Sequence, residues 1–391
     1  MERVFLLFRL PGFPALVALW KLILGGHWTV GVMLSQFALV VFVGFFMYRL
    51  MRDLAWSSWI RFFVLFSYST GIFPHYARYM LTDSVYGSLA LLSVLSLCRI
   101  CLDLKVQRVD WVSLFLSIFI MGFWRETTPY FVITLLLLIV ALFKFARKKA
   151  AVVFVGLCFV TAIPQGTLMA VHKHTCGLAI VSAGTASALL WGMSELSCVN
   201  PDFIKETFLK EEFPNGGSLD PGMIRSALHR MVQKRVPSCT SFRMDCAYFY
   251  SEIKRDFFAS LINHPLDYLK INARGEILRI VCCTHGPLRC FGKYSWSTNS
   301  LLQFIYEAFL TGIGLVYALY NLPLFFRRVS IQKDREALIR CALLFHALGF
   351  ILVYALFHLE YRYVISSTVL MGVLGWWGVA DFVNARRKIH V

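Results

Sequence analysis

The chain has 391 residues, of which 58% are hydrophobic and 16% are charged, and its mean hydropathy is +0.65. Soluble globular domains carry roughly 25% charged residues, so this composition excludes an ordinary soluble protein and predicts an all-α polytopic membrane protein. The net charge of +17 does not indicate a nucleic-acid partner, because Lys and Arg concentrate in short loops between apolar segments. The expected surroundings are therefore a lipid bilayer.

The apolar segments predict about nine membrane-spanning helices, since a bilayer core of about 30 Å needs roughly 20 apolar residues per helix. The spans are expected near residues 30–50, 57–74, 83–101, 110–124, 128–145, 149–171, 301–322, 338–357 and 363–385. Residues 4–26 are also apolar enough for a span, but two prolines, Arg9 and Lys21 interrupt them. We therefore predict a juxtamembrane or re-entrant segment over residues 1–29.

This pattern divides the chain into four parts. The segment 1–29 is followed by an N-terminal transmembrane bundle (30–171), an extracytoplasmic loop domain (172–300) and a C-terminal transmembrane bundle (301–391). In the loop domain, residues 219–235 predict a soluble helix with Asp220 as N-cap and Pro221 at the first helical position. Residues 263–281 predict an amphipathic helix lying on the membrane surface.

Cysteines concentrate in the loop domain, which holds seven of the eleven in the chain: Cys176, Cys198, Cys239, Cys246, Cys282, Cys283 and Cys290. Outside the cytoplasm disulfides are permitted, and an odd number leaves at least one thiol unpaired within the domain. The pair Cys98 and Cys101 lies at the end of an apolar segment, where helix packing is favoured over a zinc site. The sequence contains no dedicated metal motif, and whether a divalent cation takes part stays open.

The loops orient the spans through their positive charges. One alternating set of loops contains Arg49, Arg52, Arg61, Arg99, Lys105, Arg108, Lys144, Arg147, Lys148, Lys149, Arg327, Arg328, Lys333, Arg335 and Arg340, and the C-terminus adds Arg386, Arg387 and Lys388. The positive-inside rule places these loops in the cytoplasm. The opposite short loops contain one arginine each and are expected outside, together with residues 172–300.

The outer loops share a chemistry, because each combines an arginine with a carboxylate and adds aromatic residues. Their ionisable and aromatic residues are His75, Arg78 and Asp83 in "PHYARYMLTDS" (74–84), Arg125 and Glu126 in "WRETTPY" (124–130), and His358, Glu360, Arg362 and Tyr363 in "HLEYRY" (358–363). Interfacial loops also carry Tyr and Trp for packing, and an Arg–Glu pair neutralises itself. Three such loops on one side nevertheless favour a binding site.

The predicted site has two kinds of residue. Arginine binds phosphate through a planar fork, so we expect Arg362, with Arg125 or Arg78, to hold a lipid phosphate. His358 and Tyr363 are further candidate substrate-binding residues. Asp83, Glu126 and Glu360 are the candidate catalytic carboxylates, as general base or as metal ligands. Asp83 opens a helix, whose positive end keeps a carboxylate ionised, although a purely capping role is the alternative. Glu126 and Glu360 are expected to orient the neighbouring arginines.

These residues and the order of several segments resemble the C-type (GT-C) membrane glycosyltransferases. The resemblance is to bacterial relatives of protein O-mannosyltransferases and lipid A aminoarabinose transferases. It covers most of the chain through "RLPGFPALVALWKLILGG" (9–26), "SQFALVVFVGFFMYRLMRDL" (35–54), "YARYMLTDSVYGSLALLSV" (76–94), "HPLDYLK" (264–270) and "HLEYRY" (358–363). It implies inverting transfer of a sugar from a polyprenyl-phosphate donor, or its dolichol equivalent, to an acceptor outside a bacterial inner membrane.

The chain departs from the family pattern at its start. In the family, a first transmembrane helix and an acidic outer loop, which usually supplies the catalytic base, precede the segment that "RLPGFP" resembles. Here Glu2 is the only carboxylate before Arg9. Either the start of the protein lies further upstream, or this is a shortened member that binds lipid phosphate without catalysis. A membrane transporter is a third hypothesis, but no inverted repeat is apparent.

Overall fold

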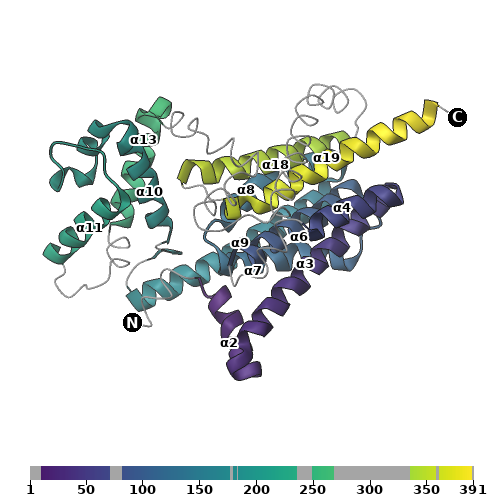
Figure 1. Cartoon of the computed structure of the whole chain (residues 1–391), viewed down its shortest axis with the longest axis horizontal. Helices are drawn as coiled ribbons and strands as arrows, with labels where there is room; N and C mark the ends of the chain where they lie inside the picture. The colour runs from purple at the N-terminus through teal and green to yellow at the C-terminus, as the bar shows by residue number, and fades with distance from the viewer. Residues whose placement is uncertain are drawn as a thin grey trace, which may run out of the picture. The chain divides into compact units, whose positions relative to one another are not determined.

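The computed structural model describes residues 10–70, 82–176, 179–182, 184–235, 249–267, 335–357 and 361–389, and these segments contain helices and loops but no strand. The helices are α2 (Gly12–Leu24), α3 (Trp28–Asp53), α4 (Ser58–Thr70), α6 (Thr82–Leu102), α7 (Arg108–Trp124), α8 (Thr128–Phe145), α9 (Arg147–Cys176), α10 (Gly184–Val199), α11 (Pro221–Arg235), α13 (Tyr250–Asn263), α18 (Arg335–Phe357) and α19 (Tyr361–Ile389) (Figure 1). Short 3-10 helices occupy Gly25–His27, Pro201–Glu206 and Phe208–Glu211.

The chain forms two compact units. The bundle unit comprises the described residues of 12–164, 279–352 and 360–391, and the loop unit comprises those of 1–11, 165–278 and 353–359. Each unit has its own packing. The bundle unit contains α2, α3, α4, α6, α7, α8 and α19 and most of α18, whereas α10, α11 and α13 belong to the loop unit.

Several helices are long and apolar enough to cross a membrane. In the described part of the chain, these stretches are Gly12–Asp53, Ser84–Leu102, Thr128–Phe145 and Arg147–His174, and a shorter apolar helix covers Val369–Asp381. Helices also occur where the spans 30–50, 83–101, 110–124, 128–145, 149–171, 338–357 and 363–385 are predicted, with α8 matching to the residue. The predicted span 301–322 lies outside the described residues, so the total of nine stays a prediction.

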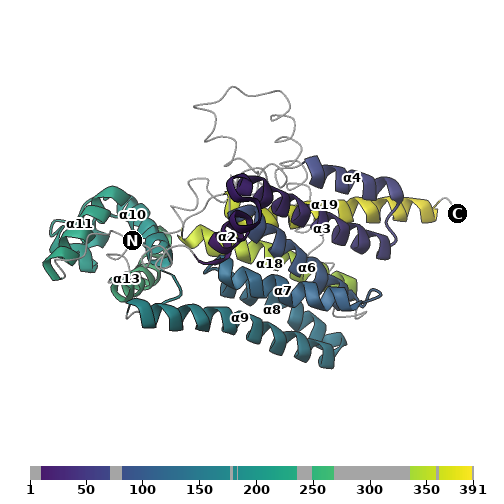
Figure 2. The same cartoon turned by 90° about the horizontal axis from the view of Figure 1, so that it is seen from below.

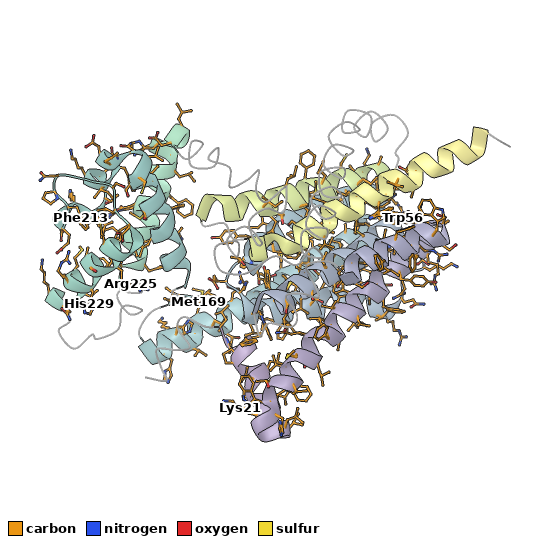
Figure 3. All side chains as sticks on the ribbon, viewed as in Figure 1. Lys21, Trp56, Met169, Phe213, Arg225 and His229 are labelled. Carbon is orange, nitrogen blue, oxygen red and sulfur yellow. The ribbon has the colours of Figure 1, made fainter. Side chains whose placement is uncertain are left out.

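The apolar stretch Gly12–Asp53 is a hairpin of two helices. α2 has 13 residues, which gives a length of about 20 Å, less than the thickness of a bilayer core. The chain reverses at Gly25, whose φ of +55° favours glycine, and α2 then packs against α3. Trp20 Nε1 donates to Ser35 Oγ at 2.8 Å across this contact. In Figure 1, the turn between α2 and α3 projects from the bundle unit, and Figure 3 shows Lys21 near this projecting turn.

The helix α6 is the centre of the bundle unit. Its apolar stretch is 94% buried, and it packs against α3, α7, α8 and α19 (Figure 2). Four serines of α6, Ser84, Ser88, Ser93 and Ser96, are buried. Small side chains allow neighbouring helices to approach closely, so this composition suits a helix that is surrounded on all sides.

A buried set of charged side chains joins the end of α3 to the α6–α7 connection. Arg99 Nε donates to Asp110 Oδ1 at 3.0 Å, and its Nη1 lies 2.6 Å from Asp53 Oδ2 in an ion pair without hydrogen-bond alignment. Arg49 Nη1 donates to the same Asp110 oxygen at 3.4 Å, and Arg49 Nη2 donates to Gln107 Oε1 at 2.8 Å. Arg99 and Asp110 are both 0% exposed. Sequence analysis treats these arginines only as loop charges, whereas here they hold helix ends together.

Further ion pairs connect the same end of the bundle to α9, α18 and α19. Asp103, which follows α6, accepts a hydrogen bond from Lys149 and lies 3.5 Å from Arg335 Nη1. Arg340 pairs with Glu336 and Asp381. All these contacts lie where α3, α6 and α19 end and where α7, α9 and α18 begin. We call this end of the bundle unit the basic pole.

The loop unit is a small helical domain with its own core. Buried side chains of α10, α11, α13 and the 3-10 helices form this core, including Met193, Phe203 and Phe257. The predicted helix 219–235 is observed as α11. Its N-cap is confirmed, because Asp220 Oδ1 accepts from the backbone N–H groups of Gly222 at 2.6 Å and Met223 at 2.9 Å. Figure 3 labels two residues of α11, Arg225 and His229.

The predicted helix 263–281 has its first described helical residues at 265–267, so its start lies two residues after the predicted one. Helix α13 ends at Asn263, and His264 has φ −124° and ψ 51° outside the helical region. His264 precedes Pro265, and a residue before proline is disfavoured in helical conformation, which explains the break. Residues 268–281 lie outside the described segments. Cys198 is a free, exposed thiol, whereas Cys239, Cys246, Cys282, Cys283 and Cys290 lie outside these segments.

Candidate functional site

The predicted site residues that the structure describes share the pole opposite the ion pairs. Asp83 lies in the first turn of α6, and Arg125 and Glu126 lie between α7 and α8. Arg362 and Tyr363 lie in the first turn of α19, which packs alongside α6. We call this end of the bundle unit the acceptor pole, from the chemistry predicted for it. Arg78, His358 and Glu360 lie outside the described residues.

The turn between α7 and α8 is held by Thr128. Its hydroxyl donates to the carbonyl oxygens of Met121 and Arg125, both at 2.9 Å, and Thr128 is 0% exposed. The backbone N–H of Arg125 also donates to Met121 O at 3.0 Å. Pro129 starts α8, where its fixed φ suits the first turn of a helix. Arg125 and Glu126 therefore lie in a turn that these hydrogen bonds fix, and both are partly exposed.

The guanidinium of Arg125 lies over the ring of Tyr86, with Cζ 5.6 Å from the ring centroid. This separation is within the range of a cation–π interaction. Tyr86 belongs to α6 and is 2% exposed. Its hydroxyl accepts a hydrogen bond from Thr127 Oγ1 at 3.4 Å, so the same tyrosine contacts two residues of the α7–α8 turn.

The helix α2 packs against the other side of this turn. A Cβ added to Gly12 would lie 2.3 Å from the Trp124 ring, and the rings of Phe13 and Trp124 meet edge to face at 6.4 Å. Only glycine allows this close approach at position 12. Gly12 and Phe13 of the "RLPGFP" segment therefore lie next to Trp124, the residue that precedes Arg125. The order of residues in the sequence does not predict this proximity.

A groove runs between α3 and α4. It has a volume of about 470 Å³ and is lined by Phe37, Val40, Val41, Gly44, Phe62, Leu65, Phe66, Tyr68 and Ser69. The Tyr68 hydroxyl donates to the carbonyl oxygen of Val40 at 3.0 Å. Apart from Tyr68 and Ser69, the described lining residues are apolar.

In the part of the chain that the structure describes, no group of three His, Cys, Asp or Glu side chains is arranged to hold an ion. The carboxylates predicted for the site come from separate connections, and Glu360 lies outside the described residues.

Sequence reasoning missed Tyr86, Thr128 and Gly12 as parts of this pole. Tyr86 follows Asp83 by three residues, a spacing that places both on one face of a helix. That spacing was the available signal for Tyr86. The contact of Gly12 with Trp124 joins residues more than a hundred positions apart, and no local sequence pattern predicts it.

The geometry suits an anion more than any other ligand. Arg125 is partly exposed, and the planar fork of an arginine side chain matches the oxygens of a phosphate. A carboxylate position one helical turn from the supporting tyrosine adds a candidate proton acceptor. Comparison of the sequence with protein-family models, with curated proteins and with solved structures found no match.

Proposed function

We propose that the protein is a membrane glycosyltransferase that moves a sugar from a polyprenyl-phosphate donor to an acceptor at the acceptor pole. The observation that carries this proposal is that Arg125, which contacts the ring of Tyr86, lies at the same pole as Asp83 and Arg362. The apolar helices add support, because the ends of helices that cross a bilayer lie near the phosphates of the lipid headgroups. The resemblance to the GT-C family, which rests on sequence segments, points to the same reaction.

In the proposed reaction, a hydroxyl oxygen of the acceptor attacks the anomeric carbon of the sugar. The bond between that carbon and the phosphate oxygen breaks, and the electron pair leaves with the polyprenyl phosphate. Asp83 takes the proton of the attacking hydroxyl, while Arg125 and Arg362 stabilise the charge that develops on the leaving phosphate. A single displacement of this kind inverts the anomeric centre.

The proposal places the acceptor pole on the periplasmic or exterior side of a bacterial inner membrane. The support is the Lys/Arg content of the loops that meet at the basic pole. Reporter fusions at about residue 215 and after Val391 test the assignment, since the first should be active outside the cytoplasm and the second inside. A cytoplasmic signal at residue 215 would contradict both the orientation and the donor side.

The activity test uses the full chain in lipid nanodiscs with a panel of polyprenyl-phosphate sugars, and measures release of polyprenyl phosphate. Arg125→Ala should lower the rate roughly 100- to 1000-fold, as expected for loss of a group that stabilises developing charge. Arg52→Ala is the matched control, because Arg52 is an arginine of the basic pole whose side chain is 53% exposed. Equal effects of the two substitutions would exclude Arg125 from the site.

Asp83→Asn separates the enzyme from a lipid-phosphate-binding protein without catalysis. Asparagine caps a helix nearly as well as aspartate but cannot accept the proton. In an enzyme, this variant should bind polyprenyl phosphate normally and lose turnover. Full turnover in the variant would assign Asp83 to capping and leave the base to another residue.

A further inference from the structure

The α6–α7 and α8–α9 connections carry an excess of positive charge at the basic pole. Residues 103–108 and 144–149, which form these connections and the adjoining helix ends, contain six cations and one carboxylate. The carboxylate is Asp103, and it is already paired with Lys149 and Arg335. The carboxylates of these two segments therefore do not balance their positive charge.

The two connections are neighbours in the fold. The ion pair between Lys149 and Asp103 joins them directly. Arg335, which begins α18, has its Nη1 3.5 Å from Asp103 Oδ2 and its Cζ 5.1 Å from the centroid of the Phe145 ring. Cations that are about 40 residues apart in the sequence are thereby brought to one part of the basic pole.

Four of these cations are not used by the fold. Lys105, Arg108, Arg147 and Lys148 are exposed, and none of them forms an ion pair within the segments that the structure describes. They differ in this respect from Arg99, which is buried and meets two carboxylates. Exposed cations without a carboxylate partner can bind an external anion.

Exposed apolar side chains continue from these cations along the helices. On α7, Arg108 is followed at intervals of four residues by Val112 and Leu116, which are 57% and 51% exposed. On α9, Lys148 is followed by Val152, which is 56% exposed. Residues four apart lie on the same face of a helix. Each of these faces therefore has a cation at its end and an apolar surface along its length.

The two faces belong to neighbouring helices whose ends lie at the level of a membrane surface. A Cβ added to Gly156 of α9 would lie 2.4 Å from the Phe115 ring of α7, so these helices pack closely (Figure 2). Thr128–Phe145 and Arg147–His174 are both long and apolar enough to cross a membrane, and only Ala146 separates them. The turn between two helices that cross a bilayer lies at its headgroups.

We propose that this part of the basic pole binds an anionic phospholipid, with its headgroup between the α6–α7 and α8–α9 connections and its acyl chains along α7 and α9. Lys105, Arg108, Arg147 and Lys148 meet the negative charge of the headgroup. A zwitterionic phospholipid has the same phosphate and chains but no net charge, so unbalanced cations favour the anionic lipid. A nucleic acid would match the charge but would leave the apolar faces uncovered. The inference depends neither on glycosyl transfer nor on the side of the membrane that this pole faces.

The test measures which lipid the chain retains. The purified full chain is equilibrated in detergent micelles with equal amounts of phosphatidylglycerol and phosphatidylcholine that have identical acyl chains, and the lipids retained after repurification are quantified. The wild type should retain phosphatidylglycerol preferentially. Arg147→Gln and Lys148→Gln should each lower this preference by up to about fivefold, which corresponds to about 1 kcal/mol per cation near an anionic surface. Equal retention of the two lipids by the wild type would overturn the inference.

Two control variants separate a local site from a general effect of charge. Arg147→Lys combined with Lys148→Arg keeps both charges and should keep the preference. Lys210→Gln combined with Lys254→Gln removes two exposed cations from the loop unit and should also leave the preference unchanged. A preference that survives neutralisation of Arg147 and Lys148 but falls in the loop-unit variant would place the lipid elsewhere and contradict the proposed site.

Two further measurements test the parts of the proposal. Inorganic phosphate at the concentration of the lipid should not displace phosphatidylglycerol, because it lacks acyl chains to cover α7 and α9. Complete displacement would mean that the pole binds a free anion and not a lipid. The thermal midpoint in lipid-free detergent should be the same for the wild type and for Arg147→Gln combined with Lys148→Gln. A lower midpoint in that variant would show that the fold itself uses these cations, against the inference.

Discussion

The two poles of the bundle unit use arginine in different ways. At the basic pole, Arg99 is 0% exposed and meets Asp110 and Asp53, so its charge is neutralised inside the protein. At the acceptor pole, Arg125 is partly exposed and lies over an aromatic ring. The two arginines both lie near helix ends, yet they differ in burial and in the kind of partner, so position alone does not determine the surroundings of an arginine.

The comparison also changes the meaning of the loop charges. The positive-inside rule counts every Lys and Arg near a span equally. Arg49, Arg99 and Arg340 are 5%, 0% and 6% exposed, so they are internal parts of the bundle. Their carboxylate partners make the net charge of that pole smaller than a count of arginines suggests. The asymmetry between the poles persists, but part of it is structural.

The largest expected effect is at the basic pole. Arg99→Ala leaves Asp110 and Asp53 without their closest charged partner in a buried position, which typically destabilises a protein by about 3–5 kcal/mol. Chemical unfolding in detergent should show this decrease, and expression of folded protein should fall. Arg52→Ala, at an exposed neighbouring position, should cost less than about 1 kcal/mol. Similar losses for the two variants would remove the distinction between buried and exposed arginines.

A second effect is expected at the acceptor pole. Gly12→Ala places a Cβ 2.3 Å from the Trp124 ring, so the contact between α2 and α7 must shift, at a cost of about 1–3 kcal/mol. Gly26→Ala is the control, because a Cβ at Gly26 meets no atom within 4 Å. The thermal midpoint should fall for Gly12→Ala only. Equal midpoints would show that α2 does not brace the turn.

A third, smaller effect concerns the hydroxyl of Thr128. Thr128→Val removes the hydrogen bonds to the Met121 and Arg125 carbonyls while keeping the shape, and should cost about 1 kcal/mol. Thr128→Ser keeps the hydroxyl and should restore most of the stability. If the turn orients Arg125, the valine variant also weakens binding of polyprenyl phosphate. A normal affinity would limit Thr128 to a structural role.

The helices were predictable because their signal is local. Apolar segments bounded by charged residues predicted helices that the structure has, and α8 coincides with residues 128–145. The N-cap of α11 followed from "LDPG", in which Asp220 precedes Pro221. The boundary between α13 and the helical residues 265–267 also has a local signal, since His264 precedes Pro265.

The contacts at the two poles were not predictable from local patterns. Arg49 and Asp110 are 61 residues apart, and Tyr86 and Thr127 are 41 residues apart. The burial of an arginine depends on how α3, α6 and α7 pack. The local sequence around a charged residue does not indicate whether the packed helices will bury it. The sequence therefore separated Arg125 from Arg99 by the loops in which they lie, but it did not indicate that Arg99 is buried and ion-paired.

The smallest expected effect is at the exposed edge of the basic pole. Lys149 and Asp103 form an ion pair whose side chains are 40% and 50% exposed, so Lys149→Ala should destabilise the fold by less than about 1 kcal/mol, and by less still at high salt.

The same ion pair predicts a pH dependence. The hydrogen bond from Lys149 is the main cause that lowers the pKa of Asp103 below its ordinary value of 3.8. Partial burial opposes this shift in pKa, and the charges of Lys149 and Arg335 reinforce it. A carboxylate with a lowered pKa stabilises the folded state above its ordinary pKa, and this contribution is lost as the pH falls from 3.8 toward the lowered value. Thermal midpoints measured from pH 6 down to pH 3 should therefore converge for the wild type and Asp103→Asn at the acid end. A difference that persists in acid, or a loss as large as that of Arg99→Ala, would mean that burial is not what separates the two kinds of ion pair.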